Sequence, residues 1–334
     1  MFAAIATILG DRVRRVPDGE TGPRLNWIEG QAPIFDNHPM FERGEEGANV
    51  DWRNKNVDDA RRTKGWHVLR PGVAKKDLVF GPLGYASAAK ASFKVFARLK
   101  RGGIVHSACR FQVSLPTPYN VIDQRIAPAF RLDVEGPYER RMLAEIDEMA
   151  AEIPHGELSI QWDVAHEMQN LDGGRPHWFD NPEEGILERL VRLGTHIPAG
   201  IELGYHLCYG DLRHKHFIEP KDTGLMVRVA NALSRAIARP IHWIHMPVPR
   251  DRTDDAYFAP LKGLRLRPET RLYLGLVHFT DGVAGARKRL DAAKKVVRDF
   301  GVATECGLGR RPPETIPQLL RIHAEISEIE AQTG

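Results

Sequence analysis

Cysteine is scarce in this chain of 334 residues, which has three, at positions 109, 208 and 306. Three cysteines cannot build the disulfide framework of a small secreted domain, so we expect buried thiols, reactive thiols or metal ligands. Long apolar runs are also lacking, since none approaches the roughly 18 residues of a membrane span. The helical start MFAAIATILGDRV lacks the basic residues and the cleavage site of a secretory signal. We therefore expect a cytoplasmic protein with no membrane partner.

An excess of charge of one sign is missing too. The chain has 47 basic and 44 acidic residues and a net charge of +3, with no long run of either sign. This balance gives no reason to expect a nucleic-acid partner. Hydrophobic residues at 42% and charged residues at 27% are close to globular averages, which excludes a disordered or fibrous chain.

From about residue 111 onward, short apolar runs alternate with helical segments, and this alternation predicts parallel βα units. Together with an earlier strand in RVRRVPDGETG (12–22), seven strands with consecutive crossovers are expected. The expected strands lie within 12–22, 111–120, 157–168, 200–211, 240–251, 271–279 and 301–309. The expected helices lie at 139–153, 182–197, 222–237, 254–264, 281–300 and 313–331. Asn181 is the expected cap of the helix that begins at Pro182.

Seven strands are one fewer than a closed barrel needs, and the chain starts inside an expected helix. We predict one α/β domain over 1–334, a (β/α)8 TIM-type barrel lacking its first strand or truncated there, with the true first strand upstream of Met1. A long irregular insertion, 23–110, follows the second strand and is expected to act as a lid. Its segment 81–103 is expected to be a helix that returns to the barrel. An open doubly wound sheet is the alternative, but no G-x-G-x-x-G follows an early strand.

Polar side chains gather at the ends of six expected strands. In a parallel barrel the active site forms at the carboxyl ends of the strands. The residues at these ends are Asp18, Glu20, Asp163, Glu167, His206, Cys208, His245, His278, Asp281 and Cys306. Such a gathering is typical of an enzyme, although each residue alone carries little weight.

His206 and Cys208 are two residues apart, so in an extended strand their side chains point the same way. Cys306 stands at the equivalent end of the last strand. One imidazole and two thiolates suit Zn²⁺ and leave a fourth position for a carboxylate, water or substrate. The alternative is two buried thiols beside a satisfied histidine. Cys109 precedes its strand and is expected to be structural.

Other polar residues allow both functional and structural roles. Asp163 and Glu167 can hold an ammonium group, orient a histidine ligand or act as a base, or can form a cap or a salt bridge. His278 is a candidate general acid. Asp281 can contact substrate or cap the following helix. His214 and His216 lie on a polar stretch (211–216) and are expected to be solvent-exposed.

VPDGETGPRLNW (16–27) has turn chemistry after the earliest strand. Asp18, Glu20 and Arg24 can line the mouth of the barrel, with Arg24 pairing a substrate carboxylate. The alternative is an ordinary turn without a ligand.

Four segments resemble the catalytic C-terminal barrel of the cobalamin-independent methionine synthases. GYHLCYGD (204–211) resembles the family's His-x-Cys strand, and ATECGLGRRPPE (303–314) resembles the segment with its second zinc cysteine. LSIQWDVAHE (158–167) resembles the strand whose Asp contacts the amino acid substrate, and YLGLVHFTDG (273–282) the strand with the catalytic His. The four occur in the family's order over about residues 105–325. The resemblance implies a barrel of the uroporphyrinogen decarboxylase and methionine synthase-like superfamily.

The resemblance also implies a zinc-dependent methyl or alkyl transferase. Zinc would bind a small thiol, lower its pKa and present it as a zinc-bound thiolate for alkylation. His206, Cys208 and Cys306 would be ligands, Asp163 would hold the substrate's polar group, and His278 would be the acid for the leaving group. The implied partners are a small-molecule thiol and an alkyl donor, which would be a folate or another methyl donor.

Three departures separate the chain from that family. The family's fourth zinc ligand is a Glu on the next strand, where this chain offers His245, so the fourth ligand is either His245 or the substrate. The family's N-terminal half-barrel is absent, and so is its first barrel strand with a Gly-Ser segment. These departures favour a different thiol, methyl donor or reaction over methionine synthesis.

Two other functions stay open. One is a metal-free decarboxylase-like enzyme of the same superfamily, in which Arg14, Arg15 or Arg24 would bind an acidic substrate. The other is a non-catalytic barrel that binds zinc or a small ligand.

Overall fold

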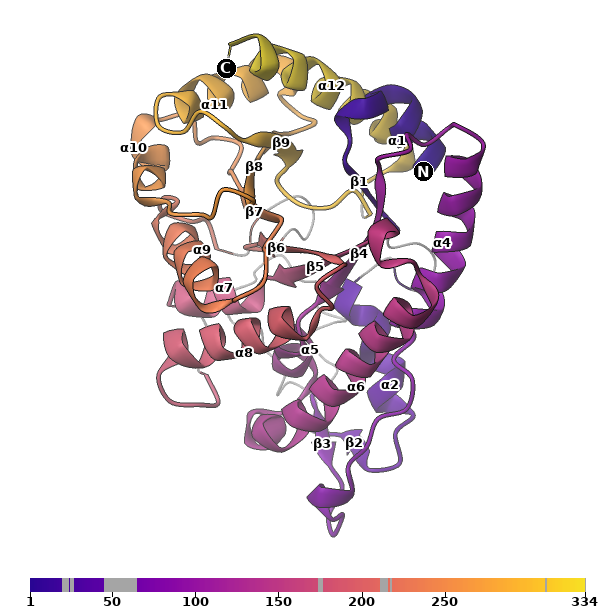
Figure 1. Cartoon of the computed structure of the whole chain (residues 1–334). Helices are drawn as coiled ribbons and strands as arrows, with labels where there is room; N and C mark the ends of the chain where they lie inside the picture. Colours follow the sequence, from indigo (N-terminus) through magenta and orange to yellow (C-terminus); the bar gives the residue numbers. More distant parts are fainter. Residues whose placement is uncertain are drawn as a thin grey trace.

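The central feature of the fold is a curled parallel sheet of seven strands in the order β1-β4-β5-β6-β7-β8-β9 (Figure 1). The computed structural model describes residues 1–19, 24, 27–44, 65–173, 177–210, 216, 218–309 and 311–333. The strands are β1 Arg15–Pro17, β4 Arg110–Pro116, β5 Leu158–Val164, β6 Glu202–Leu207, β7 Trp243–Pro247, β8 Arg271–Val277 and β9 Gly301–Thr304. Within the described ranges the edge strands β1 and β9 do not pair. The predicted incomplete TIM-type barrel is therefore confirmed.

Helices cover the outer face of this sheet (Figure 1). They are α1 Phe2–Leu9, α4 Tyr85–Arg101, α5 Pro118–Arg125, α6 Arg131–Glu152, α7 His166–Leu171, α8 Pro182–His196, α9 Gly224–Ala236, α10 Asp255–Phe258, α11 Gly282–Lys294 and α12 Ile316–Thr333. In α4 the buried Ala86, Ala89 and Phe96 recur at helical spacing and face the core. α1 and α12 pack together beside the two edge strands. No helix in the described part of the chain combines the length and the apolar character needed to cross a bilayer.

Several local predictions differ from the structure, and one is the start of α6, which begins at Arg131 and not at position 139. A helix, α5, begins at Pro118 where a loop was expected, because Thr117 accepts a hydrogen bond from the Asn120 backbone N–H and Pro118 suits the first helical turn. Asn181 precedes α8 with a φ of 50°, but its side chain makes no capping bond to the backbone. Its amide instead lies 3.4 Å from the Glu184 carboxylate.

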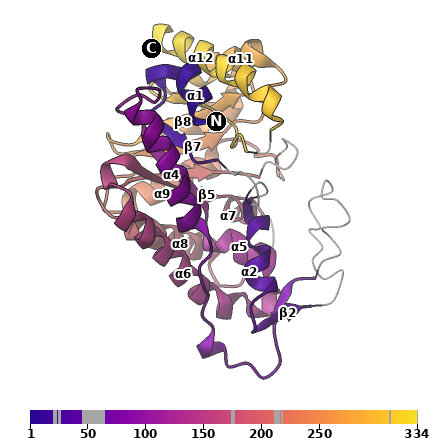
Figure 2. The ribbon, with the colours of Figure 1, turned by 90° about the vertical axis from the view of Figure 1, so that its right-hand side faces the viewer.

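The described part of the insertion 23–110 forms a small layer against α5 and α6 (Figure 2). It contains the short helix α2, Ala32–Asp36, and an antiparallel pair of strands, β2 Phe41–Arg43 and β3 His67–Leu69. The Phe35 ring stacks on the Tyr138 ring of α6, with centroids 5.7 Å apart. The expected helix within 81–103 is present as α4. The role of the insertion as a lid stays a prediction.

The amino-terminal end of the barrel is filled by side chains of its own strands. Arg15 of β1 pairs with Glu202 of β6 at 2.5 Å, and its guanidinium lies 4.2 Å from the ring centre of Trp243 on β7. Ser159 also donates to Glu202 at 3.0 Å. Arg15 therefore links β1 to β6 and β7 across the interior of the barrel, at the end opposite to the candidate site. Cys109 lies at that same end, just before β4, and burial raises the pKa of its thiol to about 11.

Candidate metal centre and active site

Three potential metal donors meet at the carboxyl ends of β6 and β9. His206 is near the end of β6, Cys208 follows that strand, and Cys306 follows β9. The imidazole nitrogen and the two sulfur atoms all lie within 4.8 Å of one another. The two sulfur atoms are 3.9 Å apart. The fold thus assembles residues that are 98 positions apart in the chain.

This donor set fits zinc. Two thiolates on a tetrahedral zinc, each about 2.3 Å from the ion, are separated by about 3.8 Å, and the observed sulfur separation is 3.9 Å. The Gly210 backbone N–H lies 3.2 Å from Cys208 Sγ, where it would stabilise a thiolate. In the protein alone, the contact with Cys306 and burial raise the pKa of Cys208 well above its usual value. A metal must therefore displace a proton from this thiol.

Asp163, His206 and His245 lie in register on three neighbouring strands. The two imidazole rings stack with centroids 4.3 Å apart and an angle of 18° between their planes. Burial, and secondarily the neighbouring His206, lowers the pKa of His245 well below its usual value, so this imidazole is neutral. Among the described residues its buried Nε2 has no hydrogen-bond partner. A neutral imidazole is the form that binds metals. His245 does not belong to the group of three donors, however, so its role as fourth ligand stays a prediction.

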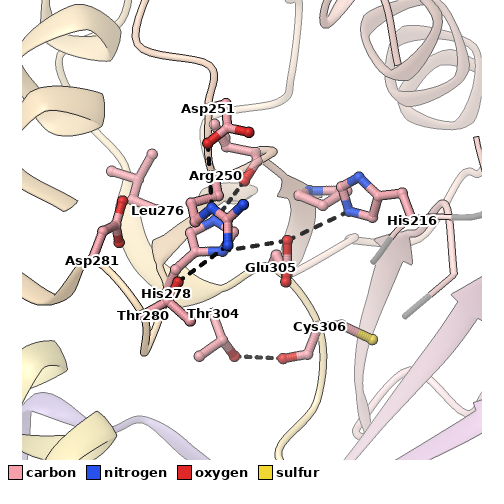
Figure 3. Close-up of polar contacts among 12 residues, drawn as sticks. His216, Arg250, Asp251, Leu276, His278, Thr280, Asp281, Thr304, Glu305 and Cys306 are labelled. Atoms are coloured by element: carbon pink, nitrogen blue, oxygen red, sulfur yellow. Dashed lines mark hydrogen bonds and ion pairs between the residues drawn. The ribbon is translucent and has the colours of Figure 1, made fainter. Parts of the chain in front are cut away.

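A buried carboxylate, Glu305, lies beside the candidate ligand Cys306 (Figure 3). Its Oε2 is 3.5 Å from His278 Nδ1 and 3.7 Å from His216 Nε2, and its Oε1 is 3.9 Å from Arg311. Sequence reasoning missed Glu305, although its position directly before a strand-end cysteine was a usable signal. The expectation that His216 is exposed is wrong, since its side chain is 1% exposed. His214 lies outside the described residues.

His278, the predicted general acid, directly follows β8 and is buried. Its Nε2 is 2.8 Å from the Val248 carbonyl oxygen, and because a carbonyl only accepts, this nitrogen donates. Burial, helped by the Arg289 charge, lowers the pKa of His278 to about 4. The ring is therefore neutral near pH 7.

Asp281 has a partner within the fold. Its two carboxylate oxygens accept hydrogen bonds from Arg289 at 2.7 and 2.9 Å. The fully buried Arg289 also donates to the carbonyl oxygens of Leu276 and Arg250. Asp281 makes no side-chain capping bond at the start of α11. The Asp281 side chain is 30% exposed, so its predicted contact with substrate would share the carboxylate with Arg289.

Asp18 and Arg24 pair with each other at the mouth of the barrel. Arg24 donates to Asp18 Oδ2 at 2.7 Å, and Asp18 directly follows β1. Burial raises the pKa of Asp18 despite the opposing effect of Arg24. Glu20, the third residue predicted here, lies outside the described residues.

Glu167 is buried in the first turn of α7, three residues after β5. The Thr117 hydroxyl donates to its Oε1, and within the described ranges its Oε2 has no hydrogen-bond partner. Burial raises the pKa of Glu167 to about 8, so the side chain is protonated near neutral pH. A carboxylic acid with a pKa in this range suits general acid catalysis.

The raised pKa of Glu167 predicts a pH-dependent stability. An unfolded glutamate titrates near 4.5 and the folded one near 8, so between these values only the folded protein holds the proton. The free energy of unfolding should therefore fall as pH rises from about 4.5 to 8. We expect Glu167→Gln to flatten this slope and to stabilise the protein at pH 8 by more than about 1 kcal/mol, measured by urea denaturation. Glu188→Gln, at an exposed position, is the control, and equal slopes in both variants would contradict the prediction.

Comparison with known proteins identifies the fold. No protein-family profile matches the chain, and no curated protein matches it. The structure is similar to that of a B12-independent methionine synthase from Shewanella sp. W3-18-1 in complex with selenomethionine. The TM-score is 0.56, and the sequences are 16% identical. The match covers 100% of this chain and 87% of that chain. A Listeria monocytogenes protein, named as a candidate vitamin-B12 independent methionine synthase, has 15% identity over 68% of this chain and 66% of its own, with a TM-score of 0.47. The second likeness is too weak to add to the first.

Proposed function

We propose that this protein, which has the fold of a B12-independent methionine synthase, is a zinc-dependent transferase that moves a methyl or other alkyl group to a small thiol. The observation that carries the proposal is the convergence of His206, Cys208 and Cys306, with donor atoms within 4.8 Å, at the carboxyl end of the barrel. Zinc bound there would supply a Lewis acid that lowers the pKa of the substrate thiol. The selenomethionine in the Shewanella protein supports a small amino acid as the substrate class.

The surrounding residues have separate roles in this proposal. Asp163, next to His206 in register, supplies a carboxylate for a cationic group of the substrate. A leaving group on the alkyl donor needs a proton. Glu167 carries one near neutral pH, whereas His278 is neutral and donates through Nε2 to Val248. Glu167, which was not predicted to be an acid, is therefore better suited than His278 to give up a proton.

Two of the three arginines proposed to bind an acidic substrate give the metal-free alternative no support. Arg15 pairs with Glu202 at the opposite end of the barrel, and Arg24 pairs with Asp18. The alkyl donor, whether a folate or another molecule, stays a prediction, as does a cytoplasmic location.

Proton release tests the proposed thiol activation. A thiol that binds as a thiolate near pH 7 must give up its proton, and we expect about one proton for each homocysteine bound by the zinc-loaded protein. The measurement is calorimetric titration in buffers of different ionisation enthalpy. S-methyl homocysteine, which has no thiol proton, is the control ligand and should release none. Homocysteine binding without proton release would contradict the proposal.

A further inference from the structure

Cys306 reaches Cys208 across two intervening strands. Cys208 follows β6 and Cys306 follows β9, and β7 and β8 lie between these strands in the sheet. Neighbouring strands are about 4.8 Å apart, so β6 and β9 are separated by roughly 14 Å measured along the sheet. The two sulfur atoms are nevertheless 3.9 Å apart. Curling of the sheet shortens the path, and the chain after β9 covers the rest by crossing the inner face of β8.

Gly275 of β8 lies where this crossing occurs. It is two residues after Tyr273, which is in register with His245, so its Cβ position faces the same side of the sheet as the His245 imidazole. A Cβ atom there would lie 2.7 Å from Glu305 Cα and 2.9 Å from the Thr304 carbonyl oxygen. Both are backbone atoms, which cannot move aside as the end of a flexible side chain can. Only glycine therefore leaves room for residues 304 and 305 against β8.

The pairing of β8 with β9 shifts at the same place. Leu274 is opposite Val302, but Val277 is opposite Thr304, so β8 has one more residue than β9 between these two pairs. A bulge of this kind disrupts the ladder of hydrogen bonds and bends the chain. The end of β9 is thus released from regular pairing directly before the segment that carries Cys306.

Two hydrogen bonds hold the crossing segment in place. The Thr304 hydroxyl donates to the Cys306 carbonyl oxygen at 2.5 Å (Figure 3). His245 of β7 makes a hydrogen bond to the Thr304 backbone. Thr304 is 7% exposed, so water does not compete freely for these contacts. Thr304 therefore fixes the backbone that carries Cys306, and the contact with His245 ties this backbone to the strand beside β6.

We propose that Gly275 and Thr304 are positioning residues that bring the Cys306 thiol to the metal centre. Gly275 acts through the side chain that it lacks, and Thr304 acts through its hydroxyl. Neither residue belongs to the group of three donors. The inference rests on the proposed function, because it concerns the zinc site, and it goes further by making the ligand set depend on the path of residues 304–306 across β8.

Cobalt(II) substitution tests the role of Gly275, because the ultraviolet absorption from thiolate-to-cobalt charge transfer grows with the number of bound thiolates. The unaltered protein should show two bound thiolates. We expect Gly275→Ala to show one and to bind zinc about a hundredfold more weakly, because the added methyl group displaces the segment that carries Cys306. Gly185→Ala is the control. A Cβ atom at Gly185 of α8 would lie 2.4 Å from the Phe179 ring and touches none of the metal donors, so this variant should keep two thiolates and its zinc affinity.

Thr304 provides a second test that introduces no steric clash. Thr304→Val removes the hydroxyl at similar shape, and we expect it to weaken zinc binding about tenfold, whereas Thr304→Ser keeps the hydroxyl and should bind zinc as the unaltered protein does. If Gly275→Ala does not fold, this pair of variants decides the inference. Two bound thiolates with unchanged zinc affinity in Gly275→Ala, or equal zinc affinity in the two Thr304 variants, overturns the inference while the proposed function stands. If the unaltered protein binds neither zinc nor cobalt, the proposed function itself fails, and the inference fails with it.

Discussion

Replacing Cys208 or Cys306 with alanine is expected to remove zinc from the purified protein, which should otherwise carry about one ion per chain. Each cysteine supplies one of three donor atoms that lie within 4.8 Å of one another. Either replacement leaves two protein donors, whereas catalytic zinc sites use three and structural sites four. We expect at least a hundredfold loss of zinc affinity, and no measurable alkyl transfer, in both variants.

Elemental analysis after dialysis against a weak chelator measures this loss. Cys109→Ala is the matched control, because Cys109 is a buried thiol at the opposite end of the barrel. This variant should keep its zinc. Full zinc content in both Cys208→Ala and Cys306→Ala would refute the ligand assignment.

Replacing Asp123 with asparagine is expected to cause the largest loss of stability, about 3–5 kcal/mol in the free energy of unfolding. The Asp123 carboxylate is fully buried and accepts hydrogen bonds from Arg131 at 2.7 Å and from His166 Nδ1 at 2.8 Å. The Arg131 side chain is 4% exposed and lies 5.2 Å from the Trp178 ring centre. Without the carboxylate, the buried guanidinium would lose the opposite charge that Asp123 supplies, and this part of its desolvation cost would no longer be offset.

Urea denaturation of the purified variant measures this loss. Lys295→Met is the control, because it breaks a pair with Asp255 in which both side chains are about 60% exposed, and it should cost less than about 1 kcal/mol. If the two variants lose similar amounts of unfolding free energy, burial does not determine how much the Asp123–Arg131 pair contributes to stability.

The local alternation of apolar strands and helices determines the class of fold without any contact between distant residues. Strands β4 to β9 were predicted within a few residues because parallel crossovers leave a repeated pattern in the chain. Parallel strands place all their carboxyl ends at one end of the barrel. Cys306 could therefore be predicted to lie near His206 and Cys208 from the sequence alone.

Contacts between side chains that are distant in sequence could not be predicted in this way. His216 looked exposed because its neighbours in the chain are polar, yet it is buried beside Glu305, which belongs to a strand end 89 positions later. Asp281 looked available for a ligand until the structure showed Arg289 bound to both of its oxygens. The residues next to a charged group in the chain do not determine which distant side chain it pairs with in the folded protein.

The sequence by itself determined the incomplete parallel barrel and the three potential metal donors, because strand direction and a spacing of two residues fix which ends and faces meet. Only the tertiary structure decided what surrounds them: the buried Glu305, the protonated Glu167 and the path of residues 304–306 across Gly275. The last depends on the register of β8 and β9 and on the absence of a side chain at Gly275. Strand register is set by packing across the whole sheet, so it is a property of the folded protein and cannot be assigned to any single segment.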